Sequence, residues 1–323
     1  MSTYVLPFEK PILELEKKMA ELRSFSEDQD IDMKSEVERI EHKIQETKQK
    51  IYSGMTPWQK VQMARHPLRP YTRDYIHLIT TDFTELHGDR LYRDDRAIIG
   101  GVARFRGRPV MIIGTQKGRD TKSNLECNFG CPYPEGYRKA LRLMKMADKF
   151  GMPILSLIDT PGAYPGLESE ERHVAEAIAV NLRESFLFKV PFISVVIGEG
   201  GSGGALGIGV SNRILILEHA YYSVISPEGC AAILWKDRAY ADKAAENLKI
   251  TARDLTTNGI ADDIIDEPLG GAHHDPAATA ENLAECVAKH LDQLEAMTVE
   301  ERIQDRYDKF RAMGVFEEES VEA

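Results

Sequence analysis

The first 55 residues carry their hydrophobic positions at helical spacing. Ile12, Leu15, Met19 and Leu22 recur at intervals of three and four residues, which predicts one apolar face of an amphipathic helix. The mostly polar segment 25–30 comes next, and we expect it to interrupt that helix.

A second helix is expected directly after this break. Ser35 and Glu38 have the spacing of a capping box, in which each side chain satisfies an unpaired amide at a helix start. The apolar positions that continue this helix are Val37, Ile40, Ile44 and Ile51. A helical pair this thin cannot bury its apolar seam alone. Residues 1–55 are therefore predicted to be a helical extension that packs on the main domain or on another subunit.

The central part of the chain alternates between helix and strand patterns. A helix is predicted over residues 72–86, and two strands, over 98–105 and 109–113, flank a hairpin turn. Residues 136–150 place apolar side chains at helical spacing and stop before a glycine, which commonly ends a helix. This alternation predicts an α/β architecture.

Two strand–glycine–helix units follow. Residues 154–158 are apolar apart from Ser156, which is typical of a parallel strand buried on both faces. The segment 159–166 (DTPGAYPG) leads from that strand into a helix predicted over 168–188. In the second unit a buried strand over 192–197 enters the glycine-rich segment 198–205 (GEGGSGGA).

The rest of the chain completes the expected domain. We predict a short buried helix after Ala205, a buried strand over 213–217 and an amphipathic helix over 275–297. The main domain is thus expected to span residues 56–297, with a C-terminal helix and an acidic tail at 298–323.

Composition and charge exclude several classes of protein. A hydrophobic content of 42% and a net charge of −11 fit a soluble globular protein and argue against a chain that wraps nucleic acid. No run reaches the roughly 18 apolar residues of a membrane span, and the first ten residues lack a signal-peptide pattern, so we expect a cytoplasmic protein.

One segment, residues 104–149, is locally basic, with 11 Lys and Arg residues against four Asp and Glu residues. This segment is either a solvent-exposed face or a binding surface for phosphates or for an acidic protein partner. The candidate contacts are Lys117, Arg119, Arg138 and Lys139.

The four cysteines do not predict a metal site. Cys127 and Cys131 are spaced like one half of a zinc site, but Cys230 and Cys286 lie far from them and from each other. A structural zinc site needs a second pair of ligands. We therefore expect reduced structural cysteines and no metal on this chain.

The glycine-rich segment fits more than one motif. Its glycines match the Gly-x-Gly-x-x-Gly pattern of dinucleotide-binding folds, with Glu218 at the place of the ribose-binding acid. Only nine residues separate Gly203 from the next strand at Arg213, however. That spacing is too short for the crossover helix of a dinucleotide-binding unit.

A serine hydrolase is a second possibility. Ser202 lies in a Gly-x-Ser-x-Gly sequence that follows a strand, as the nucleophile of such an enzyme does. Asp262 and then His273 or His274 come later in the required order, although acids and histidines are common in a charged chain. The motif depends on a tight strand–turn–helix around the serine, which the sequence alone does not establish.

The same glycines also suit an oxyanion site. Backbone without a Cβ approaches a ligand closely, and amides at a helix start carry partial positive charge. Gly162 and Ala163 in the first loop are expected to line the same pocket if the two strands are neighbours. Glycines that merely permit close packing of helix on sheet, in a scaffold that organises partners, remain an alternative.

Several segments together resemble one known family. Besides 159–166 and 198–205, they are 65–67 (RHP), 69–72 (RPYT), 134–140 (PEGYRKA), 226–231 (SPEGCA) and 267–273 (EPLGGAH). In this order, and over nearly the whole chain, they are similar to the alpha subunits of acetyl-CoA carboxylase carboxyltransferases. The resemblance implies a crotonase-like (ClpP/crotonase) fold, a β-β-α superhelix, here with an N-terminal helical extension.

The resemblance also implies a reaction and its site. Gly203 and Gly204 are expected to supply backbone amides that hold the ureido oxygen of biotin, and Gly162, Ala163 and Tyr164 to line the biotin pocket. The reaction implied is transfer of a carboxyl group from carboxybiotin to acetyl-CoA, giving malonyl-CoA, the first committed step of fatty acid synthesis. It works by positioning and by electrostatic stabilisation, without a side-chain nucleophile.

Partners follow from the same resemblance. The implied complex pairs this chain with a beta subunit of similar fold that carries a zinc ribbon, in a stoichiometry of two alpha and two beta chains. Biotin is expected on a biotin carboxyl carrier protein, charged by a biotin carboxylase, and not on this chain. Carboxyl transfer within a biotin-dependent decarboxylase shares this chemistry and stays open at this point.

Overall fold

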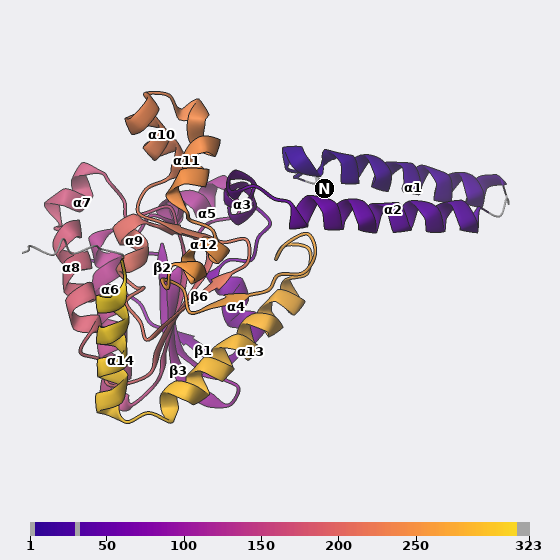
Figure 1. Cartoon of the computed structure of the whole chain (residues 1–323). Helices are drawn as coiled ribbons and strands as arrows, with labels where there is room; N and C mark the ends of the chain where they lie inside the picture. The colour runs from indigo at the N-terminus through magenta and orange to yellow at the C-terminus, as the bar shows by residue number, and fades with distance from the viewer. Residues whose placement is uncertain (1–3, 30–32, 315–323) are drawn as a thin grey trace, which may run out of the picture.

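A mixed β-sheet runs through the molecule and carries helices on both faces (Figure 1). The structure is a computed structural model that describes residues 4–29 and 33–314. Its strands are β1 (Thr80–Glu85), β2 (Ile98–Phe105), β3 (Arg108–Thr115), β4 (Ile154–Thr160), β5 (Phe192–Gly201), β6 (Arg213–Leu217), β7 (Tyr221–Ser223) and β8 (Asp263–Ile265).

Helices make up most of the remaining described residues. The α-helices are α1 (Lys10–Gln29), α2 (Lys34–Ser53), α3 (Pro57–Ala64), α4 (Thr72–Ile79), α5 (Thr121–Glu126), α6 (Pro134–Phe150), α7 (Leu167–Glu171), α8 (Val174–Ser185), α9 (Ser202–Leu206), α10 (Pro227–Trp235), α11 (Ala241–Leu248), α12 (Ala252–Thr257), α13 (Pro276–Glu295) and α14 (Val299–Ala312). The 3₁₀ helices are η1 (Pro7–Glu9), η2 (Asn128–Gly130) and η3 (Arg238–Tyr240). No helix in this described part combines the length and the apolar character that crossing a membrane requires.

The sheet places its most apolar strands at the centre. Its order is β1-β2-β3-β4-β5-β6-β8, with β7 pairing on the far end of β5. The pairs β1–β2 and β2–β3 are antiparallel, whereas β3 to β4 and the pairs beyond it are parallel. Every residue of β4 and β5 is buried, as parallel strands covered on both faces are. The predicted α/β class and the hairpin between β2 and β3 are confirmed.

Two helical layers cover this sheet. On one side α6 packs on β2 and β3 and against α8, and on the other α4 and α13 contact each other and the strands. The C-terminal helix α14 lies beside α8 (Figure 1). It is held there by Arg306, a fully buried side chain that donates to the carbonyl oxygens of Ser185, Phe188 and Val190. The division of the chain at residues 55 and 297 stays a prediction.

The N-terminal helices form a hairpin that projects from the body (Figure 1). Ile12 of α1 and Ile40 and Ile44 of α2 are buried in its seam, which confirms the predicted apolar stripe. The cluster continues at the base of the hairpin to Met55 and to Met63 of α3. The two helices therefore bury most of their apolar surface against each other, and only the base is anchored on the body.

Two details of the predicted hairpin are wrong. The helix α1 continues through residues 25–29 without the expected break, and residue 30 lies outside the described residues. The capping box is absent because α2 already begins at Lys34. Met33 is the N-cap, and its carbonyl accepts the first helical bonds from Glu36 and Val37, so Ser35 lies inside the first turn.

The helix predicted over 72–86 ends halfway. α4 stops at Ile79, and Thr80–Glu85 pairs with β2 as the edge strand β1. The segment holds three β-branched threonines, which favour a strand once a neighbouring edge offers backbone partners. Tertiary pairing thus outweighed helical spacing at this position.

The helix predicted over 168–188 is two helices. α7 ends at Glu171 and α8 begins at Val174, because His173 between them adopts a left-handed conformation with φ 62°. Arg172 at this break donates to the buried carboxylate of Glu135 on α6.

Candidate active site

The glycine-rich segment is part strand and part helix. It was expected to be a loop followed by a helix after Ala205, but β5 runs on to Gly201 and α9 already starts at Ser202. The extension exists because β7 supplies a parallel partner for Glu199–Gly201. The chain passes from strand to helix at Ser202, whose φ of 52° lies in the left-handed region.

The first turn of α9 leaves backbone donors unused. Gly201 is the N-cap and has no side chain to accept from the next amides. Within the described residues, no hydrogen-bond acceptor meets the amides of Gly203 and Gly204. Amides of a first helical turn have no partner inside the helix, so these two remain free to hold an anion.

The two loops predicted to share a pocket do meet. A Cβ on Gly204 would lie 2.5 Å from the nitrogen of Ala163 and 2.5 Å from the carbonyl carbon of Gly162. Gly162 has a φ of 149°, and its amide donates to the Thr160 hydroxyl at 3.1 Å. Backbone therefore lies directly against backbone, which only glycine at residue 204 permits.

Tyr164 lies further along the first loop. Its amide donates to the carbonyl of Pro132 at 3.0 Å, and its ring lies 4.7 Å from the ring of Tyr133. The guanidinium groups of Arg93 and Arg172 stand over the Tyr133 ring, each 5.1 Å from its centre. The half-buried Tyr164 thus belongs to an aromatic and cationic wall beside the Gly162–Ala163 contact.

A pocket of about 230 Å³ opens at the start of α9. Its lining is mainly apolar and includes Ser202, Gly203 and Tyr222, together with Phe310 of α14 and Met313 beyond it. The residues predicted to line the biotin pocket are not part of this lining. Gly162 and Ala163 instead lie against the backbone of Gly204.

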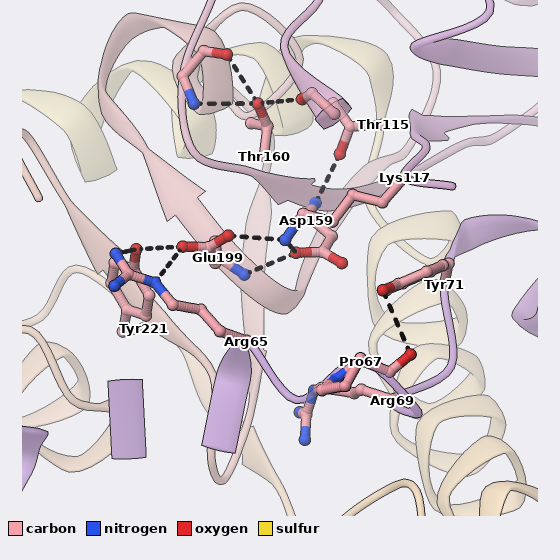
Figure 2. A network of polar contacts seen from close by, with 12 residues as sticks. Arg65, Pro67, Arg69, Tyr71, Thr115, Lys117, Asp159, Thr160, Glu199 and Tyr221 are labelled. Atoms are coloured by element: carbon pink, nitrogen blue, oxygen red, sulfur yellow. Dashed lines mark hydrogen bonds and ion pairs between the residues drawn. The ribbon is translucent and has the colours of Figure 1, made fainter. Parts of the chain in front are cut away.

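A buried polar network lies under the two loops (Figure 2). Lys117 Nζ donates to Asp159 Oδ1 at 2.6 Å and to Glu199 Oε2 at 2.7 Å. The other oxygen of Glu199 accepts from Arg65 Nε at 2.6 Å and from the Tyr221 hydroxyl at 2.7 Å. Five segments of the chain therefore meet at the carboxyl ends of β4 and β5.

The network has a defined charge. Burial disfavours the charged form of Glu199, but Lys117 and Arg65 outweigh it and lower its pKa to about 2. Burial raises the pKa of Asp159 above its ordinary value, and the Lys117 ammonium offsets this only in part. Glu199 is therefore ionised at neutral pH. The positive charge of Lys117 offsets the repulsion between the carboxylates of Glu199 and Asp159.

The sequence did not identify this network, although it carried a signal. Asp159 directly follows the apolar run of β4, and Glu199 stands inside the glycine-rich segment after β5. Acids at the carboxyl ends of adjacent parallel strands must lie close together. Their partners Lys117 and Arg65 come from segments with no pattern that pairs them with either acid.

Most of the basic residues proposed to bind phosphates or a protein partner instead form ion pairs or hydrogen bonds within the chain. Lys139 is fully buried and donates to Asp94, and Arg138 donates to Asp89. Lys117 belongs to the network just described. Arg119 lies over the ring of Tyr71 and pairs with Asp74, and it is the only one of the four candidates with an exposed side chain.

The serine hydrolase alternative lacks its catalytic partners. Ser202 has the strand-to-helix position and the positive φ of a nucleophile elbow. Yet Asp262 binds the Ile214 amide and Lys309, and His273 stacks on His66 near the base of the N-terminal hairpin. Among the described residues, no histidine forms a hydrogen bond with Ser202 or lines its pocket.

Comparison with known proteins decides between the remaining chemistries. A family model described as acetyl co-enzyme A carboxylase carboxyltransferase-like matches residues 5–314. The chain belongs to this carboxyltransferase family. The expectation of a transferase is thereby confirmed.

Curated relatives of the carboxyltransferase match over almost its full length. Proteins named acetyl-coenzyme A carboxylase carboxyl transferase subunit alpha are 57% identical in Listeria innocua, over 97% of this chain and 98% of theirs. The Geobacter metallireducens protein of that name is 55% identical, over 98% and 99%. In Synechococcus elongatus the identity is 53%, over 98% of this chain and 97% of the relative.

Solved structures share the fold of the carboxyltransferase at low identity. The transcarboxylase 12S matches with a TM-score of 0.58 and 22% identity, over 70% of this chain and 42% of that chain. The beta subunit of Pseudomonas aeruginosa geranyl-CoA carboxylase matches with a TM-score of 0.56 and 17% identity, over 76% and 46%. These neighbours confirm the crotonase-like fold predicted from the sequence.

Proposed function

We propose that this carboxyltransferase chain is the alpha half of an active site that transfers a carboxyl group from carboxybiotin to acetyl-CoA, giving malonyl-CoA. The observation that carries the proposal is the pair of unbonded amides at Gly203 and Gly204, at a helix start packed against a second glycine loop. The names of the relatives, each an alpha subunit of such an enzyme, support the same substrates.

The residues present fit a biotin ring. A Cβ on Gly162 would meet nothing nearer than the Gly201 carbonyl oxygen at 4.0 Å, so the backbone leaves open space there, and the two free amides are the donors that a ureido oxygen needs. We assign Gly162, Ala163 and Tyr164 to the wall of this biotin site, since their loop lies against Gly204. The ligand arrives on a carrier protein and is not attached to this chain.

The chain contributes electrostatics and position to the reaction. Bound carboxybiotin supplies the carboxyl group that acetyl-CoA accepts. The amides of Gly203 and Gly204 stabilise negative charge on the ureido oxygen, a contribution of about 3 kcal/mol for each donor in comparable sites. The close backbone contact with Ala163 excludes water from one side of α9. Ser202 takes no part as a nucleophile.

Several partners belong to the proposal. A beta subunit completes the site and binds acetyl-CoA, and a biotin carboxyl carrier protein and a biotin carboxylase supply the charged biotin. The word alpha in the names of the relatives supports a second type of subunit. An assembly of two alpha and two beta chains is the form we propose. The cytoplasmic location stays a prediction.

Reconstitution tests the proposal. The purified chain is combined with a carboxyltransferase beta subunit, and malonyl-CoA-dependent carboxylation of free biotin is measured in the reverse direction. We expect activity from the mixture and none from either chain alone. Activity of the lone alpha chain, or an inactive mixture in which the two chains demonstrably bind each other, would contradict the proposal.

A further inference from the structure

The pairing of β4 with β5 is interrupted just before the active site. Ile158 pairs with Val196, but the next pair is Thr160 with Gly200. Asp159 alone therefore faces the three residues 197–199, so β5 carries a bulge at this point. Bulges bend a strand and redirect the residues that follow, and they are frequent next to active sites.

The side chain of Asp159 fills this bulge. Its Oδ1 accepts from the Glu199 amide at 2.9 Å, and a Cβ on Gly198 would lie 2.5 Å from the same oxygen. The amide of Asp159 in turn donates to the Thr115 hydroxyl at 2.6 Å. The carboxylate thus takes the place of the ladder bond that the bulge removes.

Lys117 holds the two acids of the bulge together. It comes from the segment after β3, and its single ammonium group contacts both Asp159 and Glu199 (Figure 2). The side chains of the two acids are 2% and 8% exposed. Without this cation, two buried carboxylates of like charge would stand next to each other, and repulsion would open the bulge.

If the bulge moves, the short segment between it and α9 has no space to change its conformation in compensation. A Cβ on Gly201 would lie 2.2 Å from the carbonyl oxygen of Pro161, and one on Gly204 would lie 2.5 Å from the nitrogen of Ala163. The segment between Glu199 and Gly204 is therefore in backbone contact with the first loop on both sides of Ser202. A shift at Glu199 must move the start of α9.

We propose that Lys117 is a positioning residue for carboxyl transfer, which by bridging Asp159 and Glu199 fixes the β5 bulge and hence the place of the Gly203 and Gly204 amides. The inference rests on the proposed function, because it assigns those amides to the reaction. Lys117 touches neither substrate in this scheme. It acts only through the two carboxylates.

Kinetics of a Lys117→Met variant, reconstituted with the beta subunit, test the inference. Misplaced donors lower kcat by at least about tenfold, whereas KM for malonyl-CoA stays within about twofold because the CoA site is not moved. Lys117→Arg keeps the positive charge and is expected to recover most of kcat. Lys122→Met, which removes an exposed lysine of the neighbouring helix α5, is the matched control and retains full activity.

Hydrogen exchange gives a readout that does not need activity. In the alpha chain alone, Lys117→Met should speed exchange in a peptide covering residues 198–206, while peptides from α13 stay as in the wild type. Lys117→Gln, a milder change, serves if the methionine variant does not fold. An unchanged kcat, or a folded variant with unchanged exchange over 198–206, overturns the inference. If the wild-type mixture is inactive, the proposed function fails, and the exchange result still decides whether Lys117 fixes this segment.

Discussion

Gly204 and Ala163 touch through their backbones, with a Cβ position on Gly204 only 2.5 Å from the Ala163 nitrogen. The contact joins the turn after β4 to the helix after β5, and neither side can retreat, since both are extensions of fully buried strands. A site made of main-chain donors depends on such contacts, because it has no side chain that can adjust by changing rotamer.

Gly204→Ala is therefore expected to lower kcat for carboxyl transfer by at least about a hundredfold, since the added methyl group must push α9 from the first loop. Gly203→Ala is the matched comparison. Its Cβ would meet only Ile178, at 3.8 Å, which is an ordinary contact. Its loss of kcat should be less than about tenfold. Equal effects of the two variants in the reconstituted assay would argue against the packing explanation.

Ser202→Gly is expected to keep carboxyl transfer and to stabilise the chain by roughly 0.5–1 kcal/mol, because glycine adopts the φ of 52° at this position without strain. A hydrolase with Ser202 as its nucleophile would lose all turnover with this substitution. Activity and thermal unfolding of the variant, together with labelling of the wild type by a fluorophosphonate probe, separate the two cases. A labelled Ser202 would revive the hydrolase alternative.

The Arg69–Glu267 pair predicts a pH dependence of stability. Both side chains are fully buried and bonded through two contacts. Burial raises the pKa of Glu267, but Arg69 outweighs it and lowers the pKa from 4.5 to about 2. In the folded state the carboxyl thus binds fewer protons than in the unfolded chain between these values. Its stabilising contribution is complete above pH of about 4.5 and is lost as pH falls toward about 2.

Glu267→Gln isolates that contribution. At pH 7 the variant leaves the Arg69 charge buried without its partner and should unfold with a free energy about 3–5 kcal/mol smaller than the wild type. Denaturant unfolding at a series of pH values should show the two proteins converging as the pH drops below 4.5. A difference that stays constant from pH 7 to pH 3 would mean that the ion pair is not its source.

Arg306→Ala is expected to loosen the C-terminal helix. Arg306 donates to three backbone carbonyls and to Asn212 Oδ1, and all four bonds are lost in the variant, although Asn212 Oδ1 still accepts from the Phe192 amide. The free energy of unfolding should fall by roughly 2–4 kcal/mol. Arg311→Ala, on the exposed side of the same helix, is the control and should have almost no effect.

Hydrogen exchange over residues 299–312 locates the change caused by Arg306→Ala. Exchange there should rise more than in α13, since α14 is the element that loses its anchor. Faster exchange spread evenly over the whole chain would instead point to a general loss of stability, without a specific role in holding α14.

The strands at the centre of the sheet followed directly from the sequence. Residues 154–158 and 192–197 are each apolar apart from one serine, and a run of that kind is stable only where both faces are covered. The edge strand β1 was missed because its alternating, partly exposed side chains carry no such signal, and only the neighbouring β2 makes a strand of it. The local sequence pattern predicts strands whose own apolar side chains require burial. It fails for a strand such as β1, which forms only because it pairs with a neighbouring strand.

The candidate site likewise has one part that the sequence predicts and one part that it does not. The two glycine loops were recognisable because glycine, without a Cβ, permits turns and close backbone approaches that other residues do not. The match of several segments in order indicated the family. The bonds from Lys117 to Asp159 and to Glu199 span 42 and 82 residues, and that from Arg65 to Glu199 spans 134. Nothing in the spacing of these residues shows that they meet, because the fold alone brings their segments together.

The sequence by itself thus determined the central buried strands, the longest helices, the family and the positions where a missing Cβ lets backbone segments approach closely. These depend on the periodicity of side chains and on the absence of a Cβ, which are local properties. Only the tertiary structure decided that α9 begins at Ser202, that its amides stay unbonded and that Lys117 lies between two acids. Those facts depend on where β7 and the segment after β3 come to lie, and such long-range contacts are set by the packing of the whole chain.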